Sequence, residues 1–584
     1  MQLGGEAAVS RELAKEIRSL RAKLGARQLG GRHGDERHAP DRAQGRVSGV
    51  VDHGDEGVNL LWPAGRPQTG LALYDSAVHD LELSTVVRAI ALGDRSEHGD
   101  LIQRVLYELC GDPEVIRYRQ AIVADLIRDP ELARGIEELL PLLDRLNDYS
   151  MTSRDMPELF QVAWWLGELE TYVDCIEALV QVFARSEGEP ASEGLCALRD
   201  LVLEIQARDS FQDLRRELPP LLSRIRGVMS ITIGINLNQD LQPVAATLLS
   251  LNEEPFTEAP LLKLLLGGSG EQETVMPLHT VRELSGAGGR MPGDRRPNPM
   301  LIPLFRDLSR VMEQVSKPVA AALEAYVDVN RRWLLRLHRA LAFYSGAAQM
   351  VRRLQAAGLP LCCPVVAPME DRVCQVADSY NVNLALQLLA QGVDDLTREV
   401  ITNDIALDED GRIIVLTGPN RGGKTTYTQG VGLVQVLAQA GLFVPGSEAL
   451  ISPVDNVYTH FPSEEELVKG TGRFGDEAQR LRELFARATR HSLVLLNESL
   501  SGTYAGESLY LARDVVRILR LLGARVVFAT HLHELAERVE AINDELDGDS
   551  LAVSMVSSRI DQEAIAQGAD EVAERRTYKV IKGP

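Results

Sequence analysis

Eight consecutive residues have the types and the spacing that hold the phosphates of a nucleotide. They are Gly418, Pro419, Asn420, Arg421, Gly422, Gly423, Lys424 and Thr425, and they fit the pattern G-x-x-x-x-G-K-[ST] at every fixed position. In this pattern the glycines let backbone N–H groups converge on phosphate oxygens at the N-terminus of a helix. Lys424 is expected to reach the β- and γ-phosphates, and the Thr425 hydroxyl is expected to ligate Mg²⁺.

The residues on both sides supply the elements that a phosphate-binding loop requires. Ile413 to Leu416 is a short apolar run rich in β-branched side chains, which predicts a buried strand. After the loop, Thr426 to Leu437 can continue as a helix. Because strand, loop and helix follow one another in this order, we predict a nucleotide-binding protein rather than a glycine-rich turn that binds nothing.

A second apolar run ends in polar residues that could act on a bound nucleotide. Leu493 to Leu496 predicts a strand, and Asn497 and Glu498 follow it directly. In a Walker B strand the first polar residue holds Mg²⁺, and the second, here Glu498, orients or deprotonates the attacking water. His531 also follows a predicted strand, at a position where a histidine can contact the γ-phosphate. The alternative is a core strand that runs into a surface loop.

The composition is that of a globular protein with more than one domain. The 584 residues are 45% hydrophobic and 25% charged, and their number favours roughly two to four domains. The formal net charge of −22 argues against a surface that is basic throughout, although a local basic lining is compatible with it. No apolar run approaches the ~18 residues that span a bilayer, and the N-terminus lacks the apolar core of a signal peptide. The six cysteines have no zinc-binding spacing, so we expect free thiols in a cytoplasmic protein.

Three regions differ in the periodicity of their apolar residues. Residues 1–70 are expected to form a short amphipathic helix and a flexible tail. Residues 71–354 have helical periodicity nearly throughout, with a strand at 229–236 and a Gly/Pro-rich loop near 267–299. Residues 355–584 alternate between strands and helices, which predicts an α/β P-loop domain C-terminal to a long, mostly α-helical region. Its strands are expected at 361–366, 413–416, 454–460, 493–496, 525–529, 551–556 and 577–581.

Taken together, the motifs in the last third of the chain resemble those of the MutS family of ABC-type ATPases. TGPNRGGKTT, which ends at Thr426, is similar to the family's TGPNMGGKST, and LVLLNESLSGT at 493–503 is similar to its LVLMDEIGRGT. Residues 465–477, which include Phe474, follow the family's pattern between these motifs, and residues 529–531 match its ATH. Asn403-Asp404 stands at the place of the family's Asn-Asp pair before the first of these strands. The resemblance implies an ATPase domain of the ABC/MutS type behind a helical core and lever region.

The resemblance also implies the residues of the site. ATP would contact residues 418–426 and Phe474, Mg²⁺ would lie at Thr425 and Asn497, and Glu498 and His531 would act in hydrolysis. Asn497 stands where the family has the magnesium aspartate, so we expect slow hydrolysis and weak metal binding. Other departures are Gly472-Arg473 in place of Ser-Thr and Ser501 in place of an arginine.

The function implied by the resemblance is ATP-dependent DNA binding in DNA repair or recombination, with a homodimer that forms on ATP and levers that move with nucleotide state. DNA contacts would fall on phosphates or on DNA shape, since no base-reading element is visible. Residues 1–70 are too few for a mismatch-reading domain, and their one aromatic residue, Trp62, is expected to cap a core. Two alternatives stay open. The acidic charge favours an ABC-type mechanochemical ATPase that acts on a protein partner, and Asn497 favours a scaffold that binds ATP with little hydrolysis.

Overall fold

A computed structural model describes residues 57–91, 96–150, 158–226, 230–239, 243–252, 332–461, 473–500, 505–545, 547–557 and 577–583. Contacts within the chain divide it into two compact units. One comprises residues 42–140, 179–201 and 336–584, and the other comprises residues 1–41, 141–178 and 202–335. The helix expected within residues 1–56 and the loop expected near 267–299 lie outside the described residues.

A six-stranded sheet forms the centre of the first unit. Its strands lie in the order β12-β13-β14-β9-β15-β16, and only β16 is antiparallel to its neighbour. Their bounds are β9 (Ile413–Thr417), β12 (Val457–His460), β13 (Leu493–Asn497), β14 (Arg525–Ala529), β15 (Ala552–Ser557) and β16 (Val580–Lys582). Every residue of β9, β13 and β14 is buried, as expected for parallel strands that helices cover on both faces. Strands were predicted from the sequence at all six of these places.

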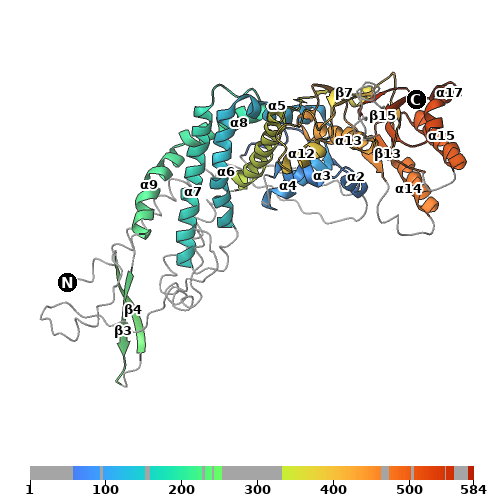
Figure 1. Ribbon diagram of the computed structural model, residues 1–584. Helices are drawn as coiled ribbons and strands as arrows, with labels where there is room; N and C mark the ends of the chain where they lie inside the picture. The colour runs from blue at the N-terminus through green and yellow to red at the C-terminus, as the bar shows by residue number, and fades with distance from the viewer. Residues whose placement is uncertain are drawn as a thin grey trace, which may run out of the picture. The chain divides into compact units, whose positions relative to one another are not determined.

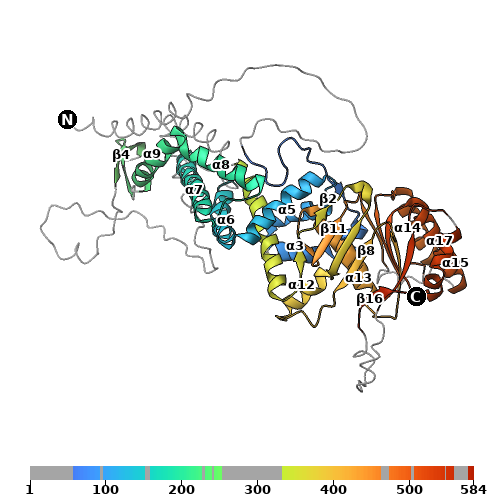
Figure 2. The same cartoon turned by 90° about the horizontal axis from the view of Figure 1, so that it is seen from above.

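Helices cover the two faces of this sheet. Val415, Leu496 and Phe528 belong to a buried apolar cluster with side chains of the helices that follow β12, β13 and β14. These helices are α14 (Arg473–Arg487), α15 (Ala505–Leu522), α16 (His533–Glu537) and α17 (Val539–Glu545). Figure 2 shows α14, α15 and α17 together on one side of the sheet. On the other face lies α13 (Lys424–Ala440), in which all but three residues are buried.

A second, mixed sheet lies against the first. It has the order β6-β11-β7-β8, formed by Val365–Val366, Glu448–Ile451, Cys374–Ser379 and Asn403–Leu407. The chain around it adds a short pair, β5 (Leu361–Cys362) with β10 (Val444–Pro445), a 3-10 turn η2 (Met369–Asp371), and α12 (Val382–Ala390). Arg525, at the start of β14, joins the two sheets because its guanidinium donates to the carbonyl oxygens of Val373, Ser452 and Pro453, each at 2.9 Å.

Helices from the first quarter of the chain pack on this domain. They are α2 (Asp75–Asp80), α3 (Leu83–Ile90), α4 (Ser96–Tyr107) and α5 (Pro113–Arg128), with a short strand pair β1 (Leu71–Ala72) and β2 (Glu108–Leu109). Gln429 Nε2 on α13 donates to the carbonyl oxygen of Asp80 (2.8 Å), and Gln439 Nε2 donates to that of Cys110 (2.9 Å). Residues 71–140, which the sequence predicts as part of the helical region, thus share a unit with the central sheet.

Long helices continue from this unit into the second one. They are α6 (Pro130–Ser150), α7 (Glu158–Arg185) and α8 (Glu193–Ala207), followed by α9 (Asp209–Arg226). Within the second unit, α7 and α9 lie side by side (Figure 1): Arg215 Nε is 2.6 Å from Glu177 Oε1, and the rings of Tyr172 and Phe211 meet edge to face. Trp165 is buried, whereas Trp164 is half-buried.

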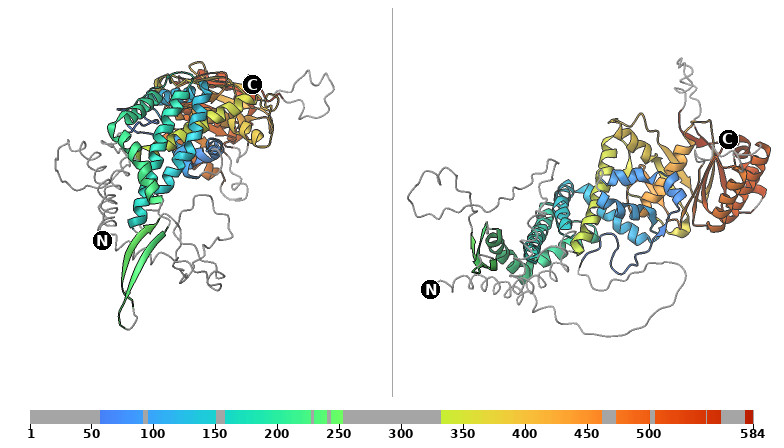
Figure 3. Two further views of the ribbon diagram at one scale, coloured as in Figure 1. Left: turned by 90° about the vertical axis from the view of Figure 1, so that its left-hand side faces the viewer. Right: turned by 90° about the horizontal axis from the view of Figure 1, so that it is seen from below.

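The strand predicted at 229–236 has a partner that its sequence did not reveal. β3 (Ser230–Leu237) pairs antiparallel with β4 (Pro243–Asn252), and the left view of Figure 3 shows this hairpin in green. The pairing shifts register between Thr232 and Ile233, where β4 carries one extra residue. The run of apolar residues at 244–251 does not alternate, so its period alone cannot distinguish a strand from a helix.

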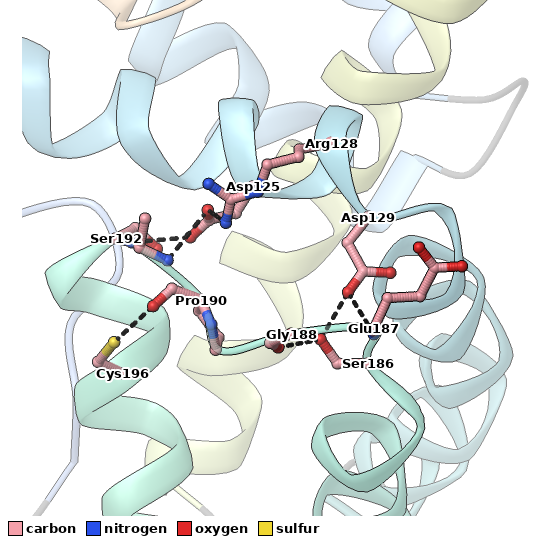
Figure 4. A network of polar contacts seen from close by, with 10 residues as sticks. Asp125, Arg128, Asp129, Ser186, Glu187, Gly188, Pro190, Ser192 and Cys196 are labelled. Carbon is pink, nitrogen blue, oxygen red and sulfur yellow. Dashed lines mark hydrogen bonds and ion pairs between the residues drawn. The ribbon is translucent and has the colours of Figure 1, made fainter.

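Two carboxylates near the end of α5 hold the turn between α7 and α8 (Figure 4). Asp125 Oδ2 accepts from the N–H of Ser192 (2.8 Å), and Asp129 Oδ2 accepts from Ser186 Oγ (2.5 Å) and the N–H of Glu187 (3.0 Å). Burial raises the pKa of Asp129, but the hydrogen bonds outweigh burial and lower this pKa below its ordinary value. The turn is therefore tied to α5 by charge-assisted hydrogen bonds.

Three further expectations can be compared with the described residues. Among them, no helix is both long and apolar enough to cross a membrane. All six cysteines are free; three are buried and Cys363 is exposed. Trp62 packs against Cys110, Val115 and Ile116, with the Arg119 guanidinium 4.7 Å from its ring centre, so this aromatic side chain covers a small core as predicted.

Candidate nucleotide-binding site

The loop predicted to bind phosphate connects the end of β9 to the start of α13. Gly418 has a φ of 148° and Gly423 a φ of 86°, values that residues with a side chain rarely adopt. A Cβ on Gly418 would also lie 2.4 Å from Ser557 Oγ. The loop therefore needs glycine at both positions to turn from the buried strand into the helix. The loop leads directly into the N-terminus of α13, where the helix dipole favours an anion.

Lys424 begins α13 and turns back over the loop. Its side chain is buried, and Nζ donates to the carbonyl oxygens of Gly418 (2.9 Å) and Pro419 (3.1 Å). Glu498 Oε1 lies 4.0 Å from the same nitrogen. Burial lowers the pKa of Lys424, and the nearby Glu498 carboxylate opposes this effect. The ammonium group thus lies in a site with one carboxylate neighbour, where a phosphate would supply further negative charge.

The parallel strand order brings the ends of β13 and β14 next to this loop. Asn497, the last residue of β13, is paired with Ala529 at the end of β14. The Asn497 side chain is almost fully buried, and its Nδ2 and Oδ1 atoms lie 3.1 Å and 3.3 Å from Thr425 Oγ1. The two residues expected at the metal are therefore in direct contact. In the described part of the chain, no three His, Cys, Asp or Glu side chains gather as a metal cluster.

Glu498 and His531 lie together beside Asn497. The backbone of Glu498 has a φ of 53°, and its N–H donates to the carbonyl oxygen of Ala529 (2.8 Å). Glu498 Oε2 is 3.5 Å from His531 Nε2, and both side chains are partly exposed. A carboxylate that lies between an imidazole and the loop lysine can hold and move a proton at this edge of the sheet.

A cavity of about 450 Å³ adjoins the loop. Loop residues 421–427 and Glu498 form one side, and residues of the second sheet and of α12 form the other, among them Tyr380, Asn381, Leu384, Ile401 and Ile405. Tyr578, from the end of the chain, also lines it. Asn381 Nδ2 donates to the carbonyl oxygen of Thr426 (3.0 Å), which fixes this wall to the first turn of α13.

Asn403 binds the segment around Tyr578 and holds it beside the cavity. Its Nδ2 donates to the carbonyl oxygen of Tyr578 (3.2 Å), and its Oδ1 accepts from the N–H of Val580 (2.7 Å). Asp404 accepts from Tyr427 through its carbonyl oxygen (3.0 Å). The Asn-Asp pair singled out by the sequence therefore positions other groups of the pocket.

The structure brings together most of the residues predicted from the sequence. Pro419, Asn420 and Arg421 are exposed at the tip of the loop, Thr425 and Thr426 open the helix, and Asn497, Glu498 and His531 face them. The Phe474 side chain lies outside the described residues. Sequence reasoning missed the cavity-lining residues Tyr380, Asn381, Leu384, Ile401 and Tyr578, because single aromatic, amide and aliphatic residues carry no motif.

Two family models match parts of this chain. A family model described as MutS domain V matches residues 414–570, which contain the loop and the strands beside it. A second family model, described as MutS2 N-terminal domain, matches residues 111–357.

Three curated relatives illustrate how the similarity is distributed. The DNA mismatch repair protein MutS of Synechococcus elongatus is 27% identical over 468 residues, covering 75% of this chain and 50% of the relative. The Endonuclease MutS2 of Thermus thermophilus is 35% identical over 188 residues, 32% of this chain and 23% of the relative. The DNA mismatch repair protein MutS 2 of Halobacterium salinarum is 39% identical over 148 residues, 25% and 17% of the two chains. The chain thus spans at most half the length of these relatives.

Proposed function

Since this chain belongs to the MutS family, we propose that it is an ATPase whose nucleotide state controls its binding to DNA. The observation that supports this most strongly is the meeting of Lys424, Thr425, Asn497 and Glu498 at the carboxyl ends of β9 and β13. These groups come from two motifs that are about 70 residues apart in the chain, and each has a distinct task in phosphoryl transfer.

The phosphates of ATP would bind at the loop and the N-terminus of α13. Lys424, which donates to two loop carbonyl oxygens, would exchange these bonds for stronger ones to phosphate oxygens. The nucleoside would enter the adjoining cavity, where Tyr578 and Ile401 offer aromatic and aliphatic surface to a base. Residues 418–426 would therefore be the phosphate site, and the second sheet would supply the base site.

Mg²⁺ would be held by Thr425 together with Asn497, directly or through water, and would neutralise charge on the phosphates. Oxygen ligands suit this ion, and the Thr425 hydroxyl and the Asn497 amide oxygen offer them. Asn497 brings no negative charge, so the metal requirement should be higher than with an aspartate. Glu498 would orient or deprotonate the attacking water, and His531 would bind near the γ-phosphate.

DNA as the partner rests on the names of three relatives, two of which are DNA mismatch repair proteins and one an endonuclease. We expect contacts mainly to phosphates, and an ATP-dependent homodimer whose helical regions move with nucleotide state. Trp62 is packed under Arg119 and is therefore unsuited to act as a wedge between bases. Affinities for a G·T-containing duplex and its matched counterpart should then be similar.

The test is DNA binding measured across a salt series, with and without ATP. If phosphates are contacted, the logarithm of affinity should fall linearly with that of salt, by about 0.9 for each contact. ATP should change the affinity, and Lys424→Ala should remove that change while leaving nucleotide-free binding intact. Absence of salt-dependent DNA binding would favour a protein partner instead, which the net charge of −22 also suits.

A scaffold that binds ATP with little hydrolysis is the second candidate, and the amide at position 497 favours it. A phosphate-release assay at several magnesium concentrations separates the two functions. ATP binding without phosphate release at any concentration would support the scaffold.

A further inference from the structure

The turn that carries Glu498 has an unusual backbone. Glu498 and Leu500 both adopt positive φ angles, 53° and 67°. Left-handed conformations of this kind are unfavourable for a residue with a side chain. In the family motif LVLMDEIGRGT a glycine stands at the place of Leu500, and glycine adopts such angles without this cost. The turn must therefore be held in place by contacts with its surroundings.

Two anchors fix the ends of the turn. The N–H of Glu498 donates to the carbonyl oxygen of Ala529 on the neighbouring strand (2.8 Å). Leu500 is buried in the apolar cluster under α15, and its carbonyl oxygen accepts from Ser508 Oγ (2.8 Å). These contacts hold residues 498 and 500. They do not fix the two peptide groups between these residues, whose orientation depends on residue 499.

Ser499 supplies that third anchor through His460. Both side chains are buried, and His460 Nδ1 lies 2.7 Å from Ser499 Oγ. Ser499 Oγ also donates to the carbonyl oxygen of His460 (3.4 Å). His460 ends β12 and is paired with Leu496 on β13, so the bond joins the ends of two adjacent parallel strands. Neither residue lines the nucleotide cavity.

We propose that His460 and Ser499 form a positioning pair that aims the Glu498 carboxylate at the site of phosphoryl transfer. Neither residue touches the nucleotide; they act by fixing the backbone on both sides of the Glu498 side chain. This role rests on the proposed function, in which Glu498 acts on the attacking water. Small displacements of a catalytic carboxylate reduce the rate strongly while leaving ground-state binding almost unchanged.

The experiment compares Ser499→Ala, His460→Ala and His460→Asn with the parent protein. Single-turnover hydrolysis and the affinity for ATP are measured for each, and a thermal melt confirms folding. We expect the two alanine variants to lose about tenfold to a hundredfold in turnover, with ATP affinity changed less than about twofold. His460→Asn can keep a hydrogen bond to Ser499 Oγ, because its amide lies near the position of Nδ1, and it should recover part of the rate.

Ser492→Ala is the matched control. Ser492 is a fully buried serine at the other end of β13, where its Oγ bonds to Asp455 Oδ1 (2.7 Å). Ser492→Ala should lower the free energy of unfolding by about as much as Ser499→Ala does, but it should leave turnover unchanged. An equal loss of turnover in Ser492→Ala would mean that general destabilisation is responsible, and would overturn the proposal.

Each substitution is also made in the Glu498→Gln background. If the pair acts through Glu498, Ser499→Ala should have no further effect there. A full additional loss in that background, or normal turnover of Ser499→Ala in the parent, would overturn the positioning role. Parental turnover in Glu498→Gln alone, or no hydrolysis by the parent, would instead refute the proposed function.

Discussion

Replacement of Arg525 by methionine should weaken the attachment of the second sheet to the central sheet and so lower the stability of the protein. Arg525 is fully buried, and it donates to three carbonyl oxygens at the ends of β7 and β11. Methionine has a similar length but no donor, so the substitution removes these bonds with little change in packing volume.

The expected loss of stability depends on the hydrogen bonds that each of the three carbonyl oxygens keeps in Arg525→Met. The oxygen of Val373 still accepts from the N–H of Ser452, and the oxygen of Ser452 still accepts from Gln435 Nε2. Among the described residues, no other donor bonds to the carbonyl oxygen of Pro453, so the substitution leaves that group without a partner. One orphaned carbonyl costs about 1–3 kcal/mol, and each weakened one costs about 0.5–1.5 kcal/mol. Removal of the buried charge offsets part of this sum. We therefore expect Arg525→Met to lower the free energy of unfolding by about 2–5 kcal/mol.

The assay is urea unfolding of the parent and of Arg525→Met, followed by circular dichroism and by the fluorescence of the four tryptophans. Arg538→Met is the matched control, because Arg538 is more than half exposed and lies 3.9 Å from Glu534 in a surface pair. Arg538→Met should change the free energy of unfolding by no more than about 0.5 kcal/mol. A change below about 1 kcal/mol in Arg525→Met would refute the idea that these bonds join the two sheets.

Four further outcomes are expected. Lys424→Ala should abolish tight ATP binding in a folded protein, which calorimetry measures; unchanged affinity would contradict the phosphate-loop assignment. Glu498→Gln should lower turnover by about 10²–10⁴-fold and retain an ATP-bound dimer, detectable by light scattering. Asn497→Asp should lower the magnesium concentration needed for hydrolysis, and an identical magnesium titration would place residue 497 away from the metal. The hydrogen bond from Arg372 holds the pKa of Asp549 below its ordinary value, against the opposing effect of burial. The unfolded chain therefore binds a proton first as pH falls, so stability present above about pH 4 should decline below it, and Asp549→Asn should lack that part of the decline.

The sequence predicted those elements of the protein that are determined by residues adjacent to one another in the chain. A run of apolar residues long enough for one buried strand can be recognised without its neighbours, and so β9, β13 and β14 were located. The glycines before Lys424 must allow a tight turn wherever they occur, so the loop could be located as well. Asn497 and Glu498 were placed near that loop by motif order and by the resemblance to a family, since strand order itself is not encoded in any single segment.

The tertiary structure decided what depends on groups distant in the chain. Tyr578 reaches the cavity because Asn403, 175 residues earlier, bonds to its carbonyl oxygen. Gln429 joins α13 to the helix containing Asp80 across 349 residues, which places residues 71–140 in the same unit as the sheet. Neither contact leaves a periodic trace in the sequence, because one amide side chain can bond to any backbone carbonyl that packing brings near it. The strand order that sets Glu498 beside Lys424 is decided in the same way, by which apolar faces can be buried together.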